Sequence, residues 1–408
     1  MKMKKISAHS RKRRIFLDYA AATPLDSGVF SKMRPFMTRH TANPSSLYSE
    51  ALVTKRALED ARRTVSSILS ATPDEIIFMG GGTESNNAAI LGVARRAFHN
   101  KLRPHIISTA IEHVSVLEAC RQAEREGAEL TVLSPDRSGV VQPEKIIGAL
   151  KADTVLVSVM YANNELGVIE PIHDIGRALN QVKRKRNSDS SSDHGVFPYF
   201  HTDASQAAQY LPLNIHSLGV NLLTLDSSKF YGPRGAGALF VEKSVPLEPL
   251  IVGGKHERSY RAGTENISAI VGLAEALRLA HEVKENESAR LTTLRDNFIA
   301  EVLMRIPDAS LNGQGAPRLP SITNICVPDL DSEFAVISLD EEGIAISSVS
   351  ACKHLSDDSS SYVLEALGTH GLECARSSLR FSLGRETTKK DLDMAIKILV
   401  DVVSRIRA

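Results

Sequence analysis

The chain has 408 residues, of which 42% are hydrophobic, and a formal net charge of +1. This is enough for a large core and for two domains. Seven Lys and Arg residues fall within residues 1–17, which leaves 42 of the 49 basic residues against 48 acidic ones. An acidic body argues against nucleic acid as the main partner. No apolar run approaches the ~18 residues that a helix needs to cross a membrane, so no membrane-spanning helix is predicted.

The N-terminal segment is basic, and residues 1–14 are predicted to form a disordered tail. It lacks the apolar stretch of a secretory signal. The composition of this segment also fits a short mitochondrial presequence. A role of the protein in RNA binding would depend on this basic segment alone. The four cysteines, Cys120, Cys326, Cys352 and Cys374, form no CxxC pair. This spacing favours a reducing compartment, without structural disulfides or a zinc site, and the predicted location is the cytoplasm.

The next part of the chain alternates short apolar runs with amphipathic stretches. The apolar runs cover residues 75–79, 105–109, 130–133, 154–160, 222–225 and 237–241. Their hydrophobicity is continuous, which predicts strands buried on both faces of a mostly parallel sheet. The stretches between them, such as residues 49–70, carry one apolar stripe and predict helices. The fold class is therefore α/β.

The later part of the chain changes character. Residues 183–197 are polar and without periodicity, so we expect a surface loop between a helix and a strand. From about residue 270, short predicted strands at 321–327, 345–348 and 379–383 mix with helices, and a capping box at Thr388 and Asp391 begins the last helix. The predicted domains are residues 15–270 and a smaller α+β domain over 271–408. Residues 15–25 are candidates for packing on the smaller domain.

Three motifs follow the predicted strands. Residues 79–87 read Met-Gly-Gly-Gly-Thr-Glu-Ser-Asn-Asn, where glycines let the backbone approach an anion and a helix begins at Thr83. His113 follows the strand at 105–109, where an imidazole could stack on a planar ring. Asn163 and Asn164 lie in a glycine-ended loop. Taken alone, the first and third motifs fit ordinary turns equally well, and His113 fits a surface residue better.

Two further residues decide the interpretation. Asp203, within His201-Thr-Asp-Ala-Ser-Gln206, follows one apolar stretch, and Lys229 precedes a glycine-rich turn after the next apolar stretch. A pyridoxal phosphate (PLP) enzyme needs a lysine for a Schiff base with the cofactor aldehyde. It also needs a carboxylate that keeps the pyridine nitrogen protonated. The sequence therefore predicts a PLP enzyme.

With these motifs in order, the chain resembles the cysteine desulfurases of the iron–sulfur-cluster and nitrogen-fixation type, in the class V aminotransferase group of fold-type I PLP enzymes. The matching stretches run from about residue 15 to the end. They are Leu17–Pro24, Asn43–Ser46, Gly82–Asn87, Glu112–His113, Asn163–Gly167, His201–Gln206, Lys229–Pro233, Arg261–Thr264, Ser347–Cys352 and Arg380–Arg385. The resemblance implies a large PLP-binding domain with a mostly parallel sheet and a smaller α+β domain.

The resemblance also implies a role for individual residues. The implied catalytic residues are Cys352 as the persulfide-forming nucleophile, Lys229 as the Schiff-base lysine and His113 as the residue that stacks on the ring. The implied cofactor-binding set is Gly82, Thr83, Glu84, His113, Asn164, Asp203, Gln206, Asp226, Ser228, Lys229 and Thr264. Of these, Thr264 would reach the phosphate of a partner subunit in a homodimer. Arg380 and Asn164 would hold the α-carboxylate of L-cysteine. Cys120, Cys326 and Cys374 match no family site and are predicted to pack in the core.

The sequence departs from the family's pattern in two places that bear on this site. The family's Ser-x-His before the lysine is Asp226-Ser-Ser228 here, so a carboxylate stands where a hydroxyl is usual. We expect Asp226 to turn away from the phosphate or to pair elsewhere. The family's glycine in the cysteine loop is Val349.

The implied reaction converts L-cysteine to L-alanine and an enzyme-bound persulfide. The sulfur would go to an acceptor protein, either an iron–sulfur cluster scaffold or a tRNA thiolation factor. The alternatives are a selenocysteine lyase, a small aminotransferase and a scaffold without turnover. Cys352 argues against an aminotransferase, which needs no thiol, but discriminates poorly against a selenocysteine lyase.

Overall fold

The structure is a computed structural model, and it describes residues 14–188, 198–348 and 360–407. Its centre is a seven-stranded sheet in the order β2-β8-β7-β6-β5-β3-β4. The strands are β2 (Ile76–Met79), β3 (His105–Thr109), β4 (Glu129–Leu133), β5 (Thr154–Ser158), β6 (Tyr199–Asp203), β7 (Leu222–Asp226) and β8 (Gly237–Val241). Only β8 runs antiparallel to its neighbours in this sheet. The predicted α/β class with a mostly parallel sheet is confirmed.

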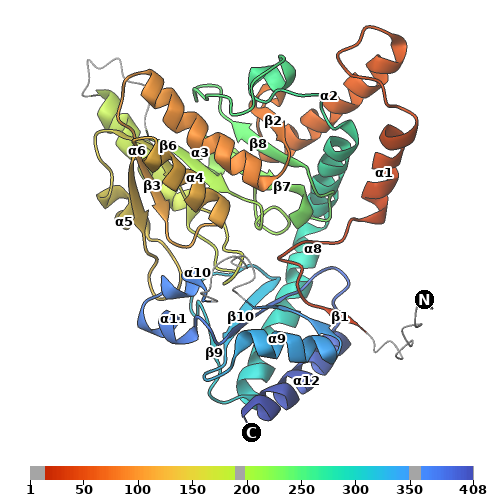
Figure 1. The fold of residues 1–408 in the computed structure, drawn as a ribbon, viewed down its shortest axis with the longest axis vertical. Helices are drawn as coiled ribbons and strands as arrows, with labels where there is room; N and C mark the ends of the chain where they lie inside the picture. Colours follow the sequence, from red (N-terminus) through yellow and green to blue (C-terminus); the bar gives the residue numbers. More distant parts are fainter. Residues whose placement is uncertain (1–13, 189–197, 349–359, 408) are drawn as a thin grey trace, which may run out of the picture.

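Helices cover the sheet and continue into the rest of the molecule (Figure 1). They are α1 (Ser27–Thr38), α2 (Ser49–Leu69), α3 (Gly82–His99), α4 (Val114–Arg125), α5 (Pro143–Gly148), α6 (Ile172–Ser188), α7 (Ile215–Leu218), α8 (Ile267–Arg305), α9 (Ser332–Glu341), α10 (Tyr362–Glu365), α11 (Thr369–Cys374) and α12 (Lys389–Arg407). Short 3-10 turns are η1 (Pro73–Glu75), η2 (Ser227–Lys229) and η3 (His256–Ser259). No helix within the three described ranges is long and apolar enough to cross a bilayer.

A second, antiparallel sheet has four strands in the order β12-β13-β10-β9. These are β9 (Ser310–Leu311), β10 (Ile322–Cys326), β12 (Ser347–Ser348) and β13 (Ser378–Ser382). Beside it, β1 (Ile15–Phe16) pairs in parallel with β11 (Ile344–Ala345), so the start of the described chain lies against its C-terminal part. The capping box that begins α12 is confirmed, because the Thr388 N–H donates to Asp391 Oδ2 at 3.0 Å and the Asp391 N–H donates to Thr388 Oγ1 at 3.2 Å.

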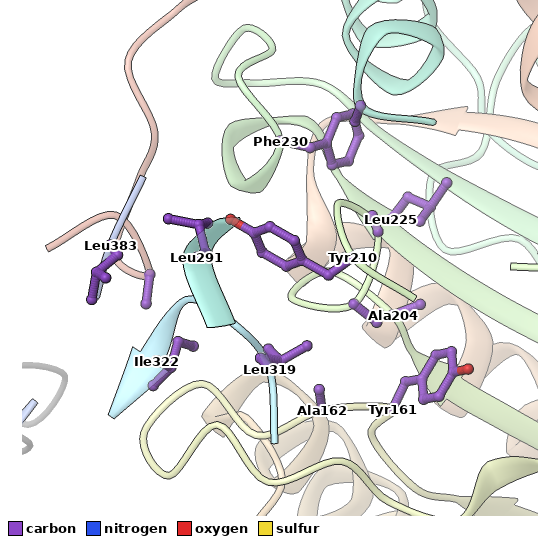
Figure 2. Packing of buried hydrophobic residues seen from close by; sticks show 14 of the residues in the cluster. Tyr161, Ala162, Ala204, Tyr210, Leu225, Phe230, Leu291, Leu319, Ile322 and Leu383 are labelled. Carbon is purple, nitrogen blue, oxygen red and sulfur yellow. The ribbon is translucent and has the colours of Figure 1, made fainter. Parts of the chain in front are cut away.

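One apolar core extends through both sheets. Figure 2 shows Tyr210, Leu225 and Phe230 from the central-sheet region on one side, and Leu319 and Ile322 on the other. The long helix α8 packs against α1 and α2 and then against α12, which joins the two regions (Figure 1). Burial of this shared apolar surface holds the two regions together. The predicted boundary at residue 270 falls in the first turn of α8 and stays a prediction.

Two sequence-based expectations are wrong. The predicted loop at 183–197 begins too early, because α6 continues to Ser188 and Lys183 is buried on it. Lys183 Nζ donates to Asn221 Oδ1 at 2.9 Å, and burial lowers the pKa of this lysine to about 8. The lysine is thus a packed helix residue with a partner and not a solvated one. Residues 189–197 and the tail at 1–13 lie outside the described residues.

The expectation of no structural disulfide is also wrong. Cys326, at the end of β10, is bonded to Cys374, at the end of α11. The two positions are 48 residues apart in the sequence, so spacing gave no sign of the pair. Cys120 is buried in the core as predicted, and burial raises the pKa of its thiol to about 12.

Candidate active site

The carboxyl ends of five strands meet at one edge of the central sheet, because β2, β3, β5, β6 and β7 all run in the same direction. Ligands collect at this edge in doubly wound sheets. Here it contains a cavity of about 400 Å³. The predicted residues that line this cavity are Gly82, Thr83, His113, Asn164, Asp203, Gln206, Asp226, Lys229 and Arg380. The fold therefore brings together side chains that are almost 300 positions apart.

Lys229 ends the short turn η2, directly after β7. Its Nζ donates to the backbone carbonyls of Ala20 at 3.2 Å and Ala21 at 2.5 Å. The Gln206 amide also donates to the Ala20 carbonyl, at 2.9 Å. The chain just after β1 thus holds the amine at the wall of the cavity, together with Gln206.

Asp203 ends β6 and lies in the cavity with both carboxylate oxygens held by donors. Oδ1 accepts the Ser205 N–H at 2.9 Å, and Oδ2 accepts the Asn86 amide at 2.8 Å. The residue is 7% exposed. Hydrogen bonds to both oxygens fix the direction of the carboxylate. A fixed carboxylate at this position can pair with a protonated ring nitrogen.

His113 is linked to Asp203 through two polar side chains. The Asn86 amide donates to Ser115 Oγ at 2.9 Å, and Ser115 Oγ lies 2.8 Å from His113 Nδ1. The Ser115 N–H also donates to Nδ1 at 3.2 Å, so we assign the ring proton to Nε2. Burial lowers the pKa of His113, with Lys229 lowering it further against the opposing effect of Asp203. The imidazole is therefore neutral near pH 7.

Arg380 lies on β13 of the second sheet and reaches into the cavity from the opposite side. Its Nη2 donates to Asp18 Oδ1 at 2.8 Å, and its Nη1 donates to the Asn164 backbone carbonyl at 3.1 Å. Arg380 Nε and Asn164 Oδ1 are buried and have no hydrogen-bond partner among the described residues. A buried guanidinium with an unused donor suits a ligand carboxylate.

The opposite end of the cavity is built on the first residues of α3. Gly81, the residue before the helix, has φ of +149°, a backbone conformation that favours glycine. Next to this helix end, the Ser205 hydroxyl is buried and without a partner in the described part of the chain. An orphaned hydroxyl beside free helix N–H groups suits an anion.

Asp226 lies inside this end of the cavity, so of the two alternatives expected from the sequence it does not turn away but pairs with donors of the protein. Its Oδ2 accepts the Gly82 N–H at 3.0 Å. Its Oδ1 accepts the Ser228 N–H at 2.9 Å and the Ser228 hydroxyl at 2.7 Å.

Three predicted residues are not among those lining the cavity. Ser228 touches it only through Asp226. Glu84 instead pairs with Arg261 at 2.9 Å and accepts the Gly80 N–H. Thr264 is exposed and lines a separate cavity of about 210 Å³.

Cys352 lies outside the described residues. The chain before its segment reaches the cavity at Ser347. The chain after it is anchored by the Ser361 hydroxyl, which donates to Glu165 Oε2 at 2.6 Å. Both flanking segments are thus placed at this site.

Sequence reasoning missed four residues of the site, Asp18, Asn86, Ser115 and Ser205. Three of them, Asp18, Asn86 and Ser205, lie within stretches that carry the family resemblance, so those stretches were the available signal. Their roles depend on contacts with residues far away in the chain, which the sequence does not display.

The residues present fit PLP and an amino-acid substrate. The carboxylate of Asp203, the amine of Lys229 and the orphaned hydroxyl of Ser205 match a ring nitrogen, an aldehyde and a phosphate. Arg380 Nε and Asn164 Oδ1 remain for the substrate.

Comparison with known proteins agrees with this assignment. Residues 15–394 match the family model described as aminotransferase class-V. The chain is 42% identical over 396 residues to cysteine desulfurase IscS of Dictyoglomus turgidum, covering 97% of this chain and 96% of the relative. It is 36% identical to the human cysteine desulfurase, covering 97% of this chain and 83% of the relative.

Solved structures agree as well. A NifS-like protein superimposes with a TM-score of 0.86 at 30% identity, covering 96% of this chain and all of that one. SspA in complex with cysteine superimposes with a TM-score of 0.76 at 32% identity, covering 90% of this chain and 98% of that one. The protein therefore belongs to the class-V aminotransferase family, among its cysteine desulfurases of the IscS and NifS type.

Proposed function

We propose that this protein is a PLP-dependent L-cysteine desulfurase, which converts L-cysteine to L-alanine and leaves a persulfide on Cys352. The observation that carries the proposal is the convergence of Lys229, Asp203 and Arg380 on one cavity. An amine, a fixed carboxylate and a buried guanidinium within one enclosed site match an amino acid handled on a PLP ring.

PLP, when bound, supplies an electron sink that stabilises negative charge at the substrate Cα. Asp203 would pair with the ring nitrogen and keep it protonated, since Ser205 and Asn86 fix the direction of its carboxylate. Lys229 would attach the cofactor and move protons at the substrate Cα. The neutral His113 offers a proton on Nε2 toward the cavity, which allows it to donate to a substrate or ring atom.

Arg380 and Asn164 would orient the substrate through its α-carboxylate. The guanidinium is already held by Asp18, so it needs little reordering when the carboxylate binds. A relative whose structure is described as a complex with cysteine supports the choice of substrate.

Cys352 would carry the sulfur. Its thiolate would bond to the substrate sulfur, the substrate C–S bond would break, and the carbon skeleton would take up a proton and leave as alanine. No described cysteine is available for this step, since Cys120 is buried with a raised pKa and the other two are bonded to each other.

We further propose a cytoplasmic homodimer that passes sulfur to an iron–sulfur cluster scaffold or a tRNA thiolation factor. The dimer is supported by large apolar side chains that a monomer would leave in water, such as Leu47 at 99% and Val252 at 79% exposure. The dimer is also supported by Thr264. The family resemblance assigns this residue to the phosphate of a partner subunit, and within its own chain it does not line the cavity. Sedimentation velocity tests the dimer, and a monomer at micromolar concentration would contradict it.

Two variants test the assignment of roles. Lys229→Ala should abolish the absorption band of lysine-bound PLP and the borohydride-stable adduct. Cys352→Ser should keep that band and lose the L-cysteine-dependent persulfide detected by mass spectrometry. Cys120→Ala is the matched control and should keep both. A persulfide that persists in Cys352→Ser would place the nucleophile elsewhere.

A further inference from the structure

The anion end of the cavity already contains an anion of the chain itself. Asp226 Oδ2 accepts the Gly82 N–H at the first turn of α3, at 3.0 Å. Its other oxygen accepts two donors from Ser228. The carboxylate thus uses a backbone donor that a phosphate at this helix end would use, and Ser228 holds it there.

Ser205 gives an independent sign that an anion belongs here. Its hydroxyl is buried in a residue that is 7% exposed, and it has no hydrogen-bond partner in the described ranges. A Cβ added to Gly82 would lie 3.3 Å from this hydroxyl and 3.1 Å from Asp226 Oδ2. The unpaired Ser205 hydroxyl and the Asp226 carboxylate therefore lie beside the same helix residue, Gly82. Because a buried polar group without a partner is destabilising, this hydroxyl points to a ligand that would accept its hydrogen bond.

The carboxylate and a phosphate cannot both take the same donors. A backbone N–H makes one strong hydrogen bond, so the Gly82 N–H must release Asp226 Oδ2 before it donates to another oxygen. If the carboxylate stays nearby, its charge also repels the phosphate at close range.

We propose that Asp226 is a built-in competitor for the phosphate of PLP. In the cofactor-free enzyme it caps α3 in place of the phosphate, and when PLP binds it must give up the Gly82 N–H. The phosphate therefore adds little net affinity, and the enzyme releases and reloads its cofactor readily. This inference depends on the proposed function, since it assumes that PLP occupies the cavity.

Comparing PLP with pyridoxal, which lacks the phosphate, isolates this effect. Dissociation constants of both are measured by titration and absorbance with the purified full-length protein stripped of cofactor. In the unchanged protein we expect the two constants to lie within about tenfold of each other. Asp226→Ser should tighten PLP by about 10- to 100-fold, because a repelling charge and a competing acceptor are both removed. It should leave pyridoxal unchanged.

Two further variants complete the test. Asp226→Asn removes the charge but keeps an oxygen acceptor, so its gain for PLP should be smaller. Asp393→Asn removes an exposed charge that pairs with Lys389 on α12, far from the cavity, and should change neither constant. Thermal melting of each stripped variant checks that it is folded.

The outcomes separate this inference from the proposed function. Tighter PLP with unchanged pyridoxal supports the competitor role. Equal changes for both ligands, or weaker PLP in Asp226→Ser, would overturn it, because Asp226 would then shape the whole site or anchor the phosphate through Ser228; PLP binding itself would stand. Binding of neither ligand by any folded protein would overturn both the inference and the proposed function.

Discussion

Replacing Glu170 with glutamine should make the stability of the protein less dependent on pH. Glu170 follows the loop that carries Asn164 and is 1% exposed. Its Oε2 accepts the Val141 N–H at 2.8 Å, while Oε1 has no partner within the described residues. Burial raises the pKa of this carboxyl to about 8, and the nearby Asp136 raises it further against the effect of the Val141 N–H. The folded protein therefore keeps Glu170 protonated at neutral pH.

The sign and size follow from proton linkage. An acid with a raised pKa in the folded state contributes stability that is present below its unfolded pKa and is lost as pH rises toward its folded pKa. Between pH 5.5 and 7.5 the unfolded state ionises Glu170 and the folded state does not. Stability should fall by about 1.4 kcal/mol per pH unit, or about 3 kcal/mol over this range, from this group alone. Glutamine does not titrate and avoids the loss.

Urea unfolding at pH 5.5 and 7.5, with equal PLP for both proteins, measures this directly. The free energy of unfolding of Glu170→Gln minus that of the unchanged protein should rise by about 3 kcal/mol between the two pH values. Taking this difference removes the contributions of all other groups. Glu144→Gln, on the exposed side of α5, controls for the substitution itself. A difference that is the same at both pH values would refute the reasoning about burial.

Two further predictions concern the second sheet. Arg380→Lys should raise KM for L-cysteine about tenfold or more, because an ammonium cannot replace the fork that contacts Asp18, Asn164 and the substrate. Arg385 pairs with Asp26 outside the cavity, so Arg385→Lys should leave KM for L-cysteine unchanged. An equal rise in KM in both variants would contradict the role of Arg380 in binding the substrate. Non-reducing peptide mapping should recover Cys326 linked to Cys374, and thiol reduction should lower stability by up to about 4 kcal/mol. Alkylation of both cysteines in the native, unreduced protein would contradict the pair.

Much of the fold follows from local pattern. The continuous apolar runs at β3, β5 and β7 are strands because both faces of a central parallel sheet are buried. Parallel strands place their carboxyl ends together, so the residues that follow them are expected at one site from the sequence pattern alone. The capping box at the start of α12 is equally local.

The features that the sequence did not reveal depend on tertiary contacts. Lys183 looks like the start of a solvated loop, yet it is buried because Asn221 offers its amide oxygen across the helix–sheet interface. The hydrogen bonds that link His113 to Asp203 pass through Asn86 and Ser115, on two different helices.

The partners of the Asp226 side chain are likewise not visible in the sequence. The Gly82 N–H, 144 residues earlier, attracts the carboxylate into the cavity. The disulfide partners are likewise set by where β10 and α11 meet.

The measurement that tests the central claim most directly is the release of sulfide and alanine from L-cysteine by the purified, PLP-loaded protein with excess thiol reductant. The account predicts that both products form in equal amounts over many turnovers, and that Lys229→Ala forms neither. A folded protein that retains PLP but releases no sulfide or alanine from L-cysteine, while acting on another amino acid, would contradict it.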